Sequence, residues 1–275
     1  MSAEPMKILL VGDTKRPEFR RARAILDSLG RLTAVGDSAA AVDWLSRGRV
    51  ADVIVVALAY PGQFSQAQIQ HLRRLAPVAR MVALAGSWCE GEMRSGKPWP
   101  GVLRIYWHQW PVRARRELRR LCTGRGSTWS LPVTATEEER ILLDVIADVV
   151  DDRQSGHIAG KAVQGRGLAA LWTRSWAMED WLCELFRRHG YATVWLRPPR
   201  AGRVRGARIA VFDGSQCSEA ELDQLRRMVA AVAPAPVIAL LDFPRAEDVE
   251  QAQAHGAAAV LSKPLMASDL LWHIV

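Results

Sequence analysis

The sequence predicts an α/β protein of two tandem domains, each a doubly wound parallel sheet of five strands. Short apolar runs alternate with segments whose apolar residues recur at helical spacing, and this alternation occurs twice along the 275 residues. Several runs, such as 53–58, are apolar throughout, which is typical of parallel strands covered by helices on both faces. We place the first domain at residues 1–121, a linker at 122–166 and the second domain at 167–275.

The first domain contains five strand-like runs and four helical segments. Its first helix is opened by Pro17, a residue favoured in the first turn of a helix, and ends before Gly30. After the fourth strand, glycines and prolines concentrate at residues 86–101, where we expect a long irregular loop. The expected strands are 7–11, 32–35, 53–58, 81–85 and 102–107, and the expected helices are 17–29, 38–45, 66–75 and 113–121.

Residues 91–98 in this loop spell most of a phosphate-binding Walker A motif. The motif needs a Ser or Thr after its lysine to hold Mg²⁺, but Pro98 stands there. The segment also follows a loop, whereas the motif opens a helix from a glycine-rich turn. We therefore do not expect this segment to bind a nucleotide.

The linker contains one amphipathic helix, which we expect at residues 136–150. Thr136 and Glu139 have the capping-box spacing, in which each side chain accepts a hydrogen bond from the other residue's backbone N–H. The apolar stripe of the helix fits either a dimerisation or docking surface, or a connector that covers one of the domains. The glycine-rich stretch 154–167 follows it.

The second domain repeats the alternation of strands and helices with one interruption. Pro198, Pro199, Gly202 and Gly206 would break the helix due after the second strand, so we expect that helix to be missing or much shortened. The expected strands are 168–172, 193–196, 208–212, 237–241 and 258–261, and the expected helices are 176–189, 219–232, 245–255 and a last one from residue 268.

The composition argues against several classes of protein. No apolar run approaches the length of a membrane span and no signal peptide is recognisable, so we expect a soluble, cytoplasmic protein without membrane contact. The cysteines and histidines show no metal-ligand spacing and no nucleophile partner, and we expect no cofactor. The net charge of +8 comes from the first domain, where Lys and Arg clearly outnumber Asp and Glu.

From Leu168 to its end, the chain resembles the receiver domain of two-component response regulators. The segment 256–265, GAAAVLSKPL, is similar to the end of the family's fourth helix, its fifth strand and its Lys-Pro pair. Residues 207–213 resemble the third strand, which ends in the phospho-accepting aspartate, and residues 236–241 resemble the fourth. The resemblance implies a flavodoxin-like sheet of strand order 2-1-3-4-5, with its functional site at the carboxyl ends of the strands.

The resemblance also implies that the phosphorylation site of the second domain is degenerate. Phosphoryl transfer to an aspartate needs an acidic pair that holds Mg²⁺, a hydroxyl after the fourth strand and a lysine after the fifth. Asp213 takes the phosphoacceptor position and Lys263 the lysine position, but Trp172 and Thr173 replace the acidic pair and Leu241 replaces the hydroxyl. We expect a poor phosphoacceptor that binds no Mg²⁺, with an ion pair between Asp213 and Lys263.

The first domain resembles the same family more faintly. Asp13 matches one member of the acidic pair, whereas Ala57 takes the phosphoacceptor position, Ala85 the hydroxyl position and Trp110 the lysine position. The resemblance therefore implies that this domain cannot be phosphorylated in the family's way. The matching segments are residues 8–13, 52–57 and 81–86.

Four tryptophans cluster in the sequence where the signalling face of the first domain would lie. Tryptophan is enriched at protein interfaces, so these residues are candidates for a partner surface. The alternative is that they pack the irregular loop onto the sheet. The four are Trp88, Trp99, Trp107 and Trp110.

We interpret the chain as a non-catalytic pseudo-receiver, a signalling adaptor of two-component type that binds protein partners such as a histidine kinase or an output protein. It is then not an enzyme, and because the sequence ends inside the last expected helix, we expect no DNA-binding output domain. One alternative is a phosphorylatable response regulator that uses Asp213 in a phosphorelay. Another is a nucleic-acid binder that uses the arginines of 113–120 and 197–208.

Overall fold

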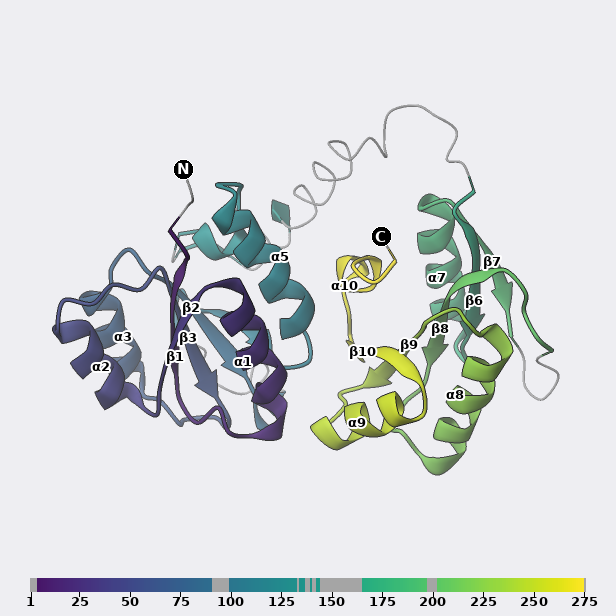
Figure 1. Cartoon of the computed structure of the whole chain (residues 1–275), viewed down its shortest axis with the longest axis horizontal. Helices are drawn as coiled ribbons and strands as arrows, with labels where there is room; N and C mark the ends of the chain where they lie inside the picture. The colour runs from purple at the N-terminus through teal and green to yellow at the C-terminus, as the bar shows by residue number, and fades with distance from the viewer. Residues whose placement is uncertain are drawn as a thin grey trace. The chain divides into compact units, whose positions relative to one another are not determined.

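The computed structural model describes residues 4–90, 99–132, 134–136, 139, 142–143, 165–196 and 202–274. The chain divides into two compact units, Met1–Asp148 and Val149–Val275, and each contains one five-stranded parallel sheet (Figure 1). The strand orders are β2-β1-β3-β4-β5 in the first unit and β10-β9-β8-β6-β7 in the second. Both correspond to the order 2-1-3-4-5, so the predicted fold class is confirmed.

The first unit follows the predicted sequence of elements closely. Helix α5 begins at Trp110, three residues earlier than predicted, because Pro111 suits the first turn of a helix. The elements are β1 (Lys7–Val11), α1 (Pro17–Leu29), β2 (Arg31–Val35), α2 (Ser38–Ser46), β3 (Val53–Leu58), α3 (Gln66–Leu75), β4 (Arg80–Ala85), the 3-10 turn η1 (Ser87–Cys89), β5 (Leu103–Tyr106), α5 (Trp110–Cys122) and the 3-10 turn η2 (Thr128–Ser130).

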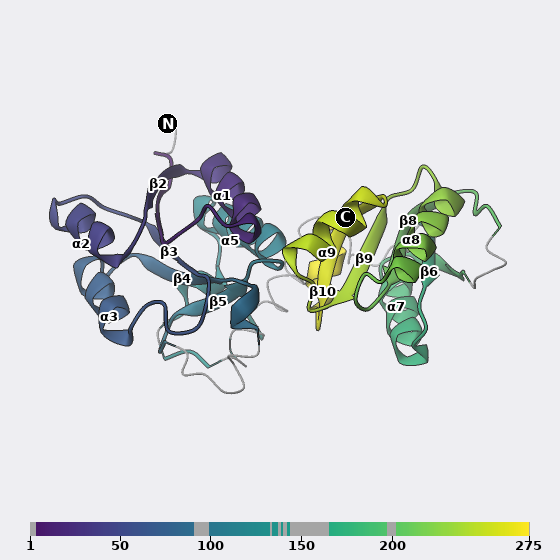
Figure 2. The ribbon, with the colours of Figure 1, turned by 90° about the horizontal axis from the view of Figure 1, so that it is seen from below.

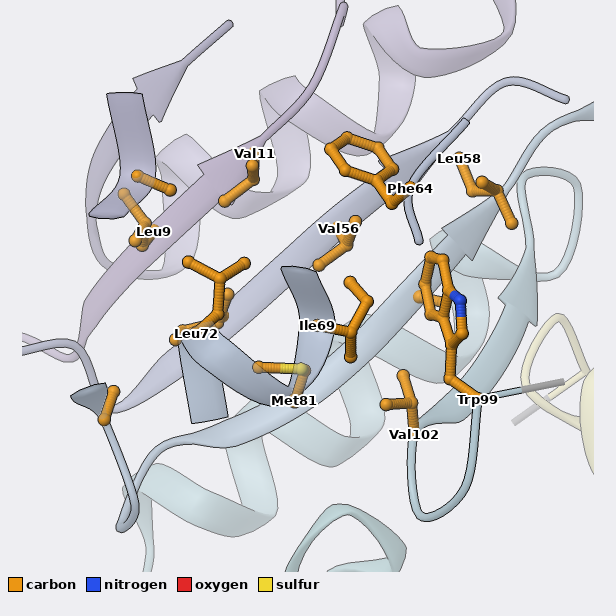
Figure 3. Close-up of a cluster of buried hydrophobic side chains, with 14 of the residues drawn as sticks. Leu9, Val11, Val56, Leu58, Phe64, Ile69, Leu72, Met81, Trp99 and Val102 are labelled. Carbon is orange, nitrogen blue, oxygen red and sulfur yellow. The ribbon is translucent and has the colours of Figure 1, made fainter. Parts of the chain in front are cut away.

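One face of the first sheet forms an apolar core with α2 and α3. Alternate residues of the strands, such as Leu9 and Val56, meet Ile69 and Leu72 from α3, as Figure 3 shows. Trp99 closes the core at the carboxyl side of the sheet, with its ring centroid 6.3 Å from that of Phe64. Helices α1 and α5 lie side by side on the other face of the sheet (Figures 1 and 2).

A buried charge cluster holds the segment after α5 against that helix. Glu117 is only 1% exposed, and its two carboxylate oxygens accept four hydrogen bonds. Oε1 accepts hydrogen bonds from the guanidinium groups of Arg116 and Arg120, at 3.1 and 3.2 Å. Oε2 receives the hydroxyl of Ser127 at 2.7 Å and the backbone N–H of Thr128 at 2.8 Å. The charge of Glu117 is therefore both neutralised and fully hydrogen-bonded, which is the condition for stable burial of an ion.

The second unit repeats the architecture with its own elements. Of the residues between β7 and β8, 202–206 form no helix, in agreement with the predicted interruption, and 197–201 lie outside the described residues. The elements are β6 (Gly167–Trp172), α7 (Trp176–Arg188), β7 (Tyr191–Trp195), β8 (Ala207–Asp213), α8 (Glu219–Val232), β9 (Val237–Asp242), α9 (Ala246–Ala254), β10 (Ala257–Lys263) and α10 (Ala267–Leu271).

The core of the second unit lies between its sheet and helices α8 and α9. Strand residues Trp172, Phe212 and Leu241 belong to the same buried cluster as Leu225 of α8 and Ala252 of α9. Because side chains alternate along a strand, the residues next to these, including Asp213 and Asp242, project toward the opposite face. This alternation decides which side chains can meet at the carboxyl edge.

Several sequence predictions fall partly or wholly outside the described residues. The Walker-like segment 91–98 lies outside them, as do most of the predicted helix 136–150 and most of the glycine-rich stretch 154–167. The capping-box contacts themselves are confirmed. The N–H of Thr136 donates to Glu139 Oε2 at 2.7 Å, and the N–H of Glu139 donates to Thr136 Oγ1 at 3.2 Å.

No described helix is long and apolar enough to cross a membrane. The cysteines carry free thiols, with Cys89 and Cys217 buried and Cys122 exposed.

Candidate functional site

Four polar side chains meet at the carboxyl edge of the second sheet. Thr173, Asp213, Asp242 and Lys263 stand at the carboxyl ends of β6, β8, β9 and β10. Trp172 of β6 is paired with Phe212 of β8, so the next residues, Thr173 and Asp213, are level with each other. Lys263 of β10 is paired with Asp242 of β9. Paired residues of parallel strands project to the same face, so the fold itself brings these four groups together.

Asp213 has a partner on each carboxylate oxygen. Oδ1 lies 2.6 Å from Lys263 Nζ, and Oδ2 accepts a hydrogen bond of 2.6 Å from the hydroxyl of Thr173. The predicted ion pair between Asp213 and Lys263 is therefore confirmed. The Asp213 side chain is buried, and its charge is stabilised by one cation and one neutral donor.

The ammonium of Lys263 has three acceptors, which equals its number of hydrogens. Nζ donates to Asp213 Oδ1, to the carbonyl oxygen of Gly214 at 2.8 Å and to Asp242 Oδ1 at 3.1 Å. Burial alone would lower the pKa of Lys263, but the hydrogen bond and charge of Asp213, followed by those of Asp242, outweigh burial and raise it. Lys263 is therefore held charged, with its donors satisfied.

The turn after β6 fixes the Thr173 hydroxyl. Its Oγ1 accepts a hydrogen bond from the N–H of Ser175 at 3.0 Å, and its own proton goes to Asp213. Ser175 is in turn the N-cap of α7, where its side chain accepts the N–H of Met178. The first turn of α7 thus positions a donor toward the carboxylate.

Trp172 is not part of this site, which corrects the expectation for the acidic-pair position. Its side chain projects to the face covered by α8 and α9, where its ring stacks on Phe212 with centroids 4.5 Å apart. The guanidinium of Arg174 lies over the same ring at 5.5 Å. The alternation of side chains explains the difference, because of two neighbouring residues at the strand end only Thr173 can face Asp213.

Leu241 is also absent from the site. It is buried in the core with Phe212, whereas the next residue, Asp242, reaches Lys263. The side chain of Asp242 is 48% exposed, so it forms the solvent side of the cluster. We missed Asp242 in the sequence because the family pattern gives a hydroxyl at this strand end and offers no role for a second carboxylate.

Among the described residues, the strand ends of the first sheet carry no matching aspartate–lysine pair. Asp13 is exposed and accepts a hydrogen bond from the N–H of Lys15 at 3.1 Å. Ala57 and Ala85 are buried, without polar side chains. Gly12 is level with Ala57 and has a φ of 121°, and a Cβ atom there would lie 2.6 Å from the carbonyl oxygen of Ala57. A carboxylate side chain at residue 12 would therefore require the backbone to move.

Trp110 does not occupy the position of the lysine, which is a further correction. It is the first residue of α5 and is fully buried, with its ring centroid 5.8 Å from that of Trp129. The strand register places Trp107 at that position instead. The N–H of Trp107 donates to the carbonyl oxygen of Ala85, and Trp107 comes directly after β5, at the level that Lys263 has at the end of β10.

The proposed tryptophan surface is contradicted for three of its four members. Trp99, Trp107 and Trp110 are buried. Trp99 belongs to the core cluster of the first sheet, and Trp110 packs against Trp129. Trp88 is 71% exposed and remains a candidate for a partner contact.

Glu221 organises the loop between β8 and α8, beside the site. Its carboxylate accepts the N–H and hydroxyl of Ser215 and the N–H of Gln216. Burial would raise the pKa of Glu221, but these hydrogen bonds, and that of Ser218, lower it overall. The S-x-x-E spacing of Ser218 and Glu221 was the signal that could have revealed this residue.

Cys217 in the same loop is expected to resist alkylation. Burial, followed by the charges of Asp248 and Glu221, raises the pKa of its thiol to about 11, so at pH 8 only about one molecule in a thousand is the reactive thiolate. In peptide mapping after iodoacetamide treatment, we expect Cys217 to be modified far more slowly than the exposed Cys122. Equal rates would contradict the buried placement of Cys217.

Among the described residues, no group of three or more His, Cys, Asp or Glu side chains is placed to hold a metal ion. The polar groups at the site are one hydroxyl, two carboxylates and one ammonium. The ammonium of Lys263 offsets one of the two carboxylates, and the remaining negative charge faces solvent at Asp242.

Comparison with known proteins finds similarity at the level of solved structures. An orphan response regulator of H. pylori is 15% identical over 40% of this chain and 94% of its own, with a TM-score of 0.34. A putative two-component response regulator/GGDEF domain protein is 13% identical over 98% of this chain and 96% of its own, with a TM-score of 0.34. The C-terminal part of E. coli RcsC, with its linker and phosphoreceiver domain, is 13% identical over 98% and 91%, with a TM-score of 0.33.

No protein-family model matches the sequence, and no curated protein matches it. At these identities and scores, the similarity concerns the fold only.

Proposed function

We propose that the second unit is a non-catalytic receiver-like module of two-component type that acts by binding a protein partner. The observation that carries the proposal is the closed network around Asp213. Both of its oxygens have partners, and all three donors of Lys263 are used. An aspartate held in this way is a structural ion-pair partner rather than a free nucleophile.

The charges around the network also oppose phosphoryl transfer. The transferring group is anionic and needs cations, commonly Mg²⁺ held by carboxylates, on its oxygens. Strand β6 supplies the hydroxyl of Thr173 where the family has carboxylates, and β9 supplies the carboxylate of Asp242 where the family has a hydroxyl. A phosphoryl group on Asp213 would compete with Asp242 for Lys263 and would be repelled by that carboxylate.

Exposed aromatic side chains at the same edge support a protein partner. Trp176, at the first position of α7, is 80% exposed, and Phe243, directly after Asp242, is 59% exposed. Phe243 also has a φ of 45°, a left-handed backbone conformation that is unfavourable for a bulky residue. Aromatic rings of this size are enriched in the centres of protein interfaces. We propose that the partner contacts these two rings.

A phosphorylation assay tests the proposal. Incubation of the protein with acetyl phosphate and Mg²⁺, or with a cognate histidine kinase, should yield no phosphoprotein by intact mass or phosphate-affinity electrophoresis. A canonical response regulator in a parallel reaction verifies the reagents. A phosphoprotein that disappears in the Asp213→Asn variant would overturn the proposal and favour the phosphorelay alternative.

The partner contact is tested separately. Once a partner has been identified, the double variant Trp176→Ser/Phe243→Ser should bind it at least about tenfold more weakly, since aromatic hot-spot residues commonly contribute more than 1 kcal/mol each. Tyr60→Ser, at another exposed aromatic residue in the first unit, is the matched control and should bind as the unmodified protein does. Undiminished binding by the double variant would exclude these rings from the interface.

A further inference from the structure

A groove in the first unit, far in the sequence from Asp213, carries positive charge that the proposed function does not use. It has a volume of about 520 Å³ and lies between helix α1 and the edge strand β2. Lys15 stands at its end next to β1, and Arg20, Arg23 and Asp27 line it from α1. The three cations and one carboxylate leave the groove with an excess of positive charge.

The cations in the groove are not neutralised by neighbouring carboxylates. Arg20, Arg23 and Asp27 lie three and four residues apart, so they share one face of α1. Within the described part of the chain, no carboxylate forms an ion pair with Lys15, Arg20 or Arg23. The other acid of α1, Glu18, is buried near Arg16 instead. The positive face of α1 is therefore available to an external anion.

The floor of the groove is small and apolar. The apolar residues of the lining are Ala24, Leu32 and Ala34, and Leu32 and Ala34 of β2 are thus only partly covered by α1. Thr14 adds one hydroxyl at the end next to Lys15. The described lining contains no aromatic ring on which a base could stack and no amide side chain to read a base edge.

Positive charge also continues around α1, beyond the groove. Desolvation of the Arg21 guanidinium, and then the nearby charge of Arg115 on α5, lower the pKa of Arg21. Two like charges are thus held close together where α1 and α5 lie side by side (Figure 2). A polymeric anion bound in the groove could extend toward this seam.

We infer that the α1–β2 groove binds the phosphodiester backbone of a nucleic acid without reading its sequence. Arginine donors match phosphate oxygens in a bidentate geometry, and each neutralised phosphate releases condensed counterions. From Arg20 to Arg23 the helix rises about 5 Å, and Lys15 extends the row of cations beyond the helix toward the end of β1. This binding is independent of the function proposed for the second unit.

Fluorescence anisotropy with labelled random-sequence oligonucleotides tests the inference on the intact chain. We expect binding to single-stranded DNA, with single-stranded RNA and duplex DNA as parallel arms, in the range of about 10⁻⁴ to 10⁻⁶ M near physiological salt. Affinity should fall linearly with the logarithm of salt concentration between about 50 and 200 mM, and it should not depend on base sequence.

The decisive variant is Arg20→Gln/Arg23→Gln, which removes two cations from the exposed face of α1. The slope of the salt dependence should decrease by about 2, and affinity at low salt should fall about tenfold or more. The matched control is Arg74→Gln/Arg227→Gln, which removes the same net charge at two exposed positions outside the groove. It should change the affinity less than twofold, and thermal unfolding of both variants should match that of the unmodified protein.

Three results would overturn the inference. The first is an absence of salt-dependent binding. The second is a loss of affinity as large in the control variant as in the groove variant, which would indicate a non-specific effect of net charge. The third is displacement of the oligonucleotide by polyglutamate, or by a mononucleotide at equal phosphate concentration, which would indicate an acidic protein or a small phosphate ligand instead.

Discussion

Replacement of Lys263 by methionine should lower the free energy of unfolding of the second unit by about 3 kcal/mol, the cost of leaving a buried charge without its partner. The Lys263 side chain is 17% exposed and that of Asp213 is 7% exposed, so solvent screens the pair only weakly. Without the ammonium, Asp213 keeps only the Thr173 hydroxyl. Hydrogen–deuterium exchange along a urea series measures the free energy of unfolding of the second unit within the intact chain.

A double variant separates charge from packing in this experiment. Asp213→Asn/Lys263→Met removes both members of the pair, so most of the lost stability should return. Equal destabilisation of the single and double variants would show that the methionine side chain destabilises the unit through poor packing. It would then say nothing about the ion pair.

The same pair predicts an alkaline loss of stability. Because the pKa of Lys263 is raised in the folded protein, its contribution is complete below the ordinary lysine value of about 10.4 and is lost as the pH rises through the raised value. The difference in unfolding free energy between the unmodified protein and Lys263→Met should therefore be constant near neutral pH and decrease above about pH 10.4. A difference that already decreases between about pH 7 and 9 would assign the effect to another group.

Glu117→Gln should destabilise the first unit by a similar amount, about 3 kcal/mol. The substitution keeps the shape of the side chain but removes the negative charge that Arg116 and Arg120 share. It also replaces one acceptor oxygen by an amide NH₂ group, which cannot accept the hydrogen bonds that the carboxylate accepted. Hydrogen exchange should show the loss across α5 and residues 123–130 first.

Glu4→Gln is the control for this substitution. Glu4 pairs with Lys7 on the exposed surface of the same unit, so loss of its charge should not change unfolding measurably. If Glu117→Gln also leaves unfolding unchanged, the buried cluster does not hold the segment after α5.

The sequence predicted most of the fold because its local signals agree with one another. Helices α3 and α8 have the predicted bounds, and both begin after a serine N-cap and carry a regular apolar stripe. The pair Asp213–Lys263 was predictable as well, because the ends of parallel strands meet at one edge of the sheet. Both signals depend on spacing along the chain, which the sequence contains directly.

The finer structure of the site was not predictable in the same way. Side chains alternate along a strand, so an error of one residue moves a side chain from the edge cluster into the core. That error separates Leu241 from Asp242. At the end of β6 both Trp172 and Thr173 were named, but only Thr173 faces the site. The exposure of a tryptophan depends on which residues cover it, and the sequence around Trp88 and Trp99 does not contain that information.

The strand registers make the two units comparable at four positions. Thr173, Asp213, Asp242 and Lys263 in the second sheet correspond to Gly12, Ala57, Gly86 and Trp107 in the first, so one set is polar and the other is uncharged. Asp242 is half exposed at the rim, so its replacement alone should change the free energy of unfolding little. Asp213 and Lys263 must then change together, because either one alone leaves a buried charge. A change of Asp213 or Lys263 alone therefore gives a less stable protein than a change of both. Sequences related to this chain should have both residues of the pair or neither.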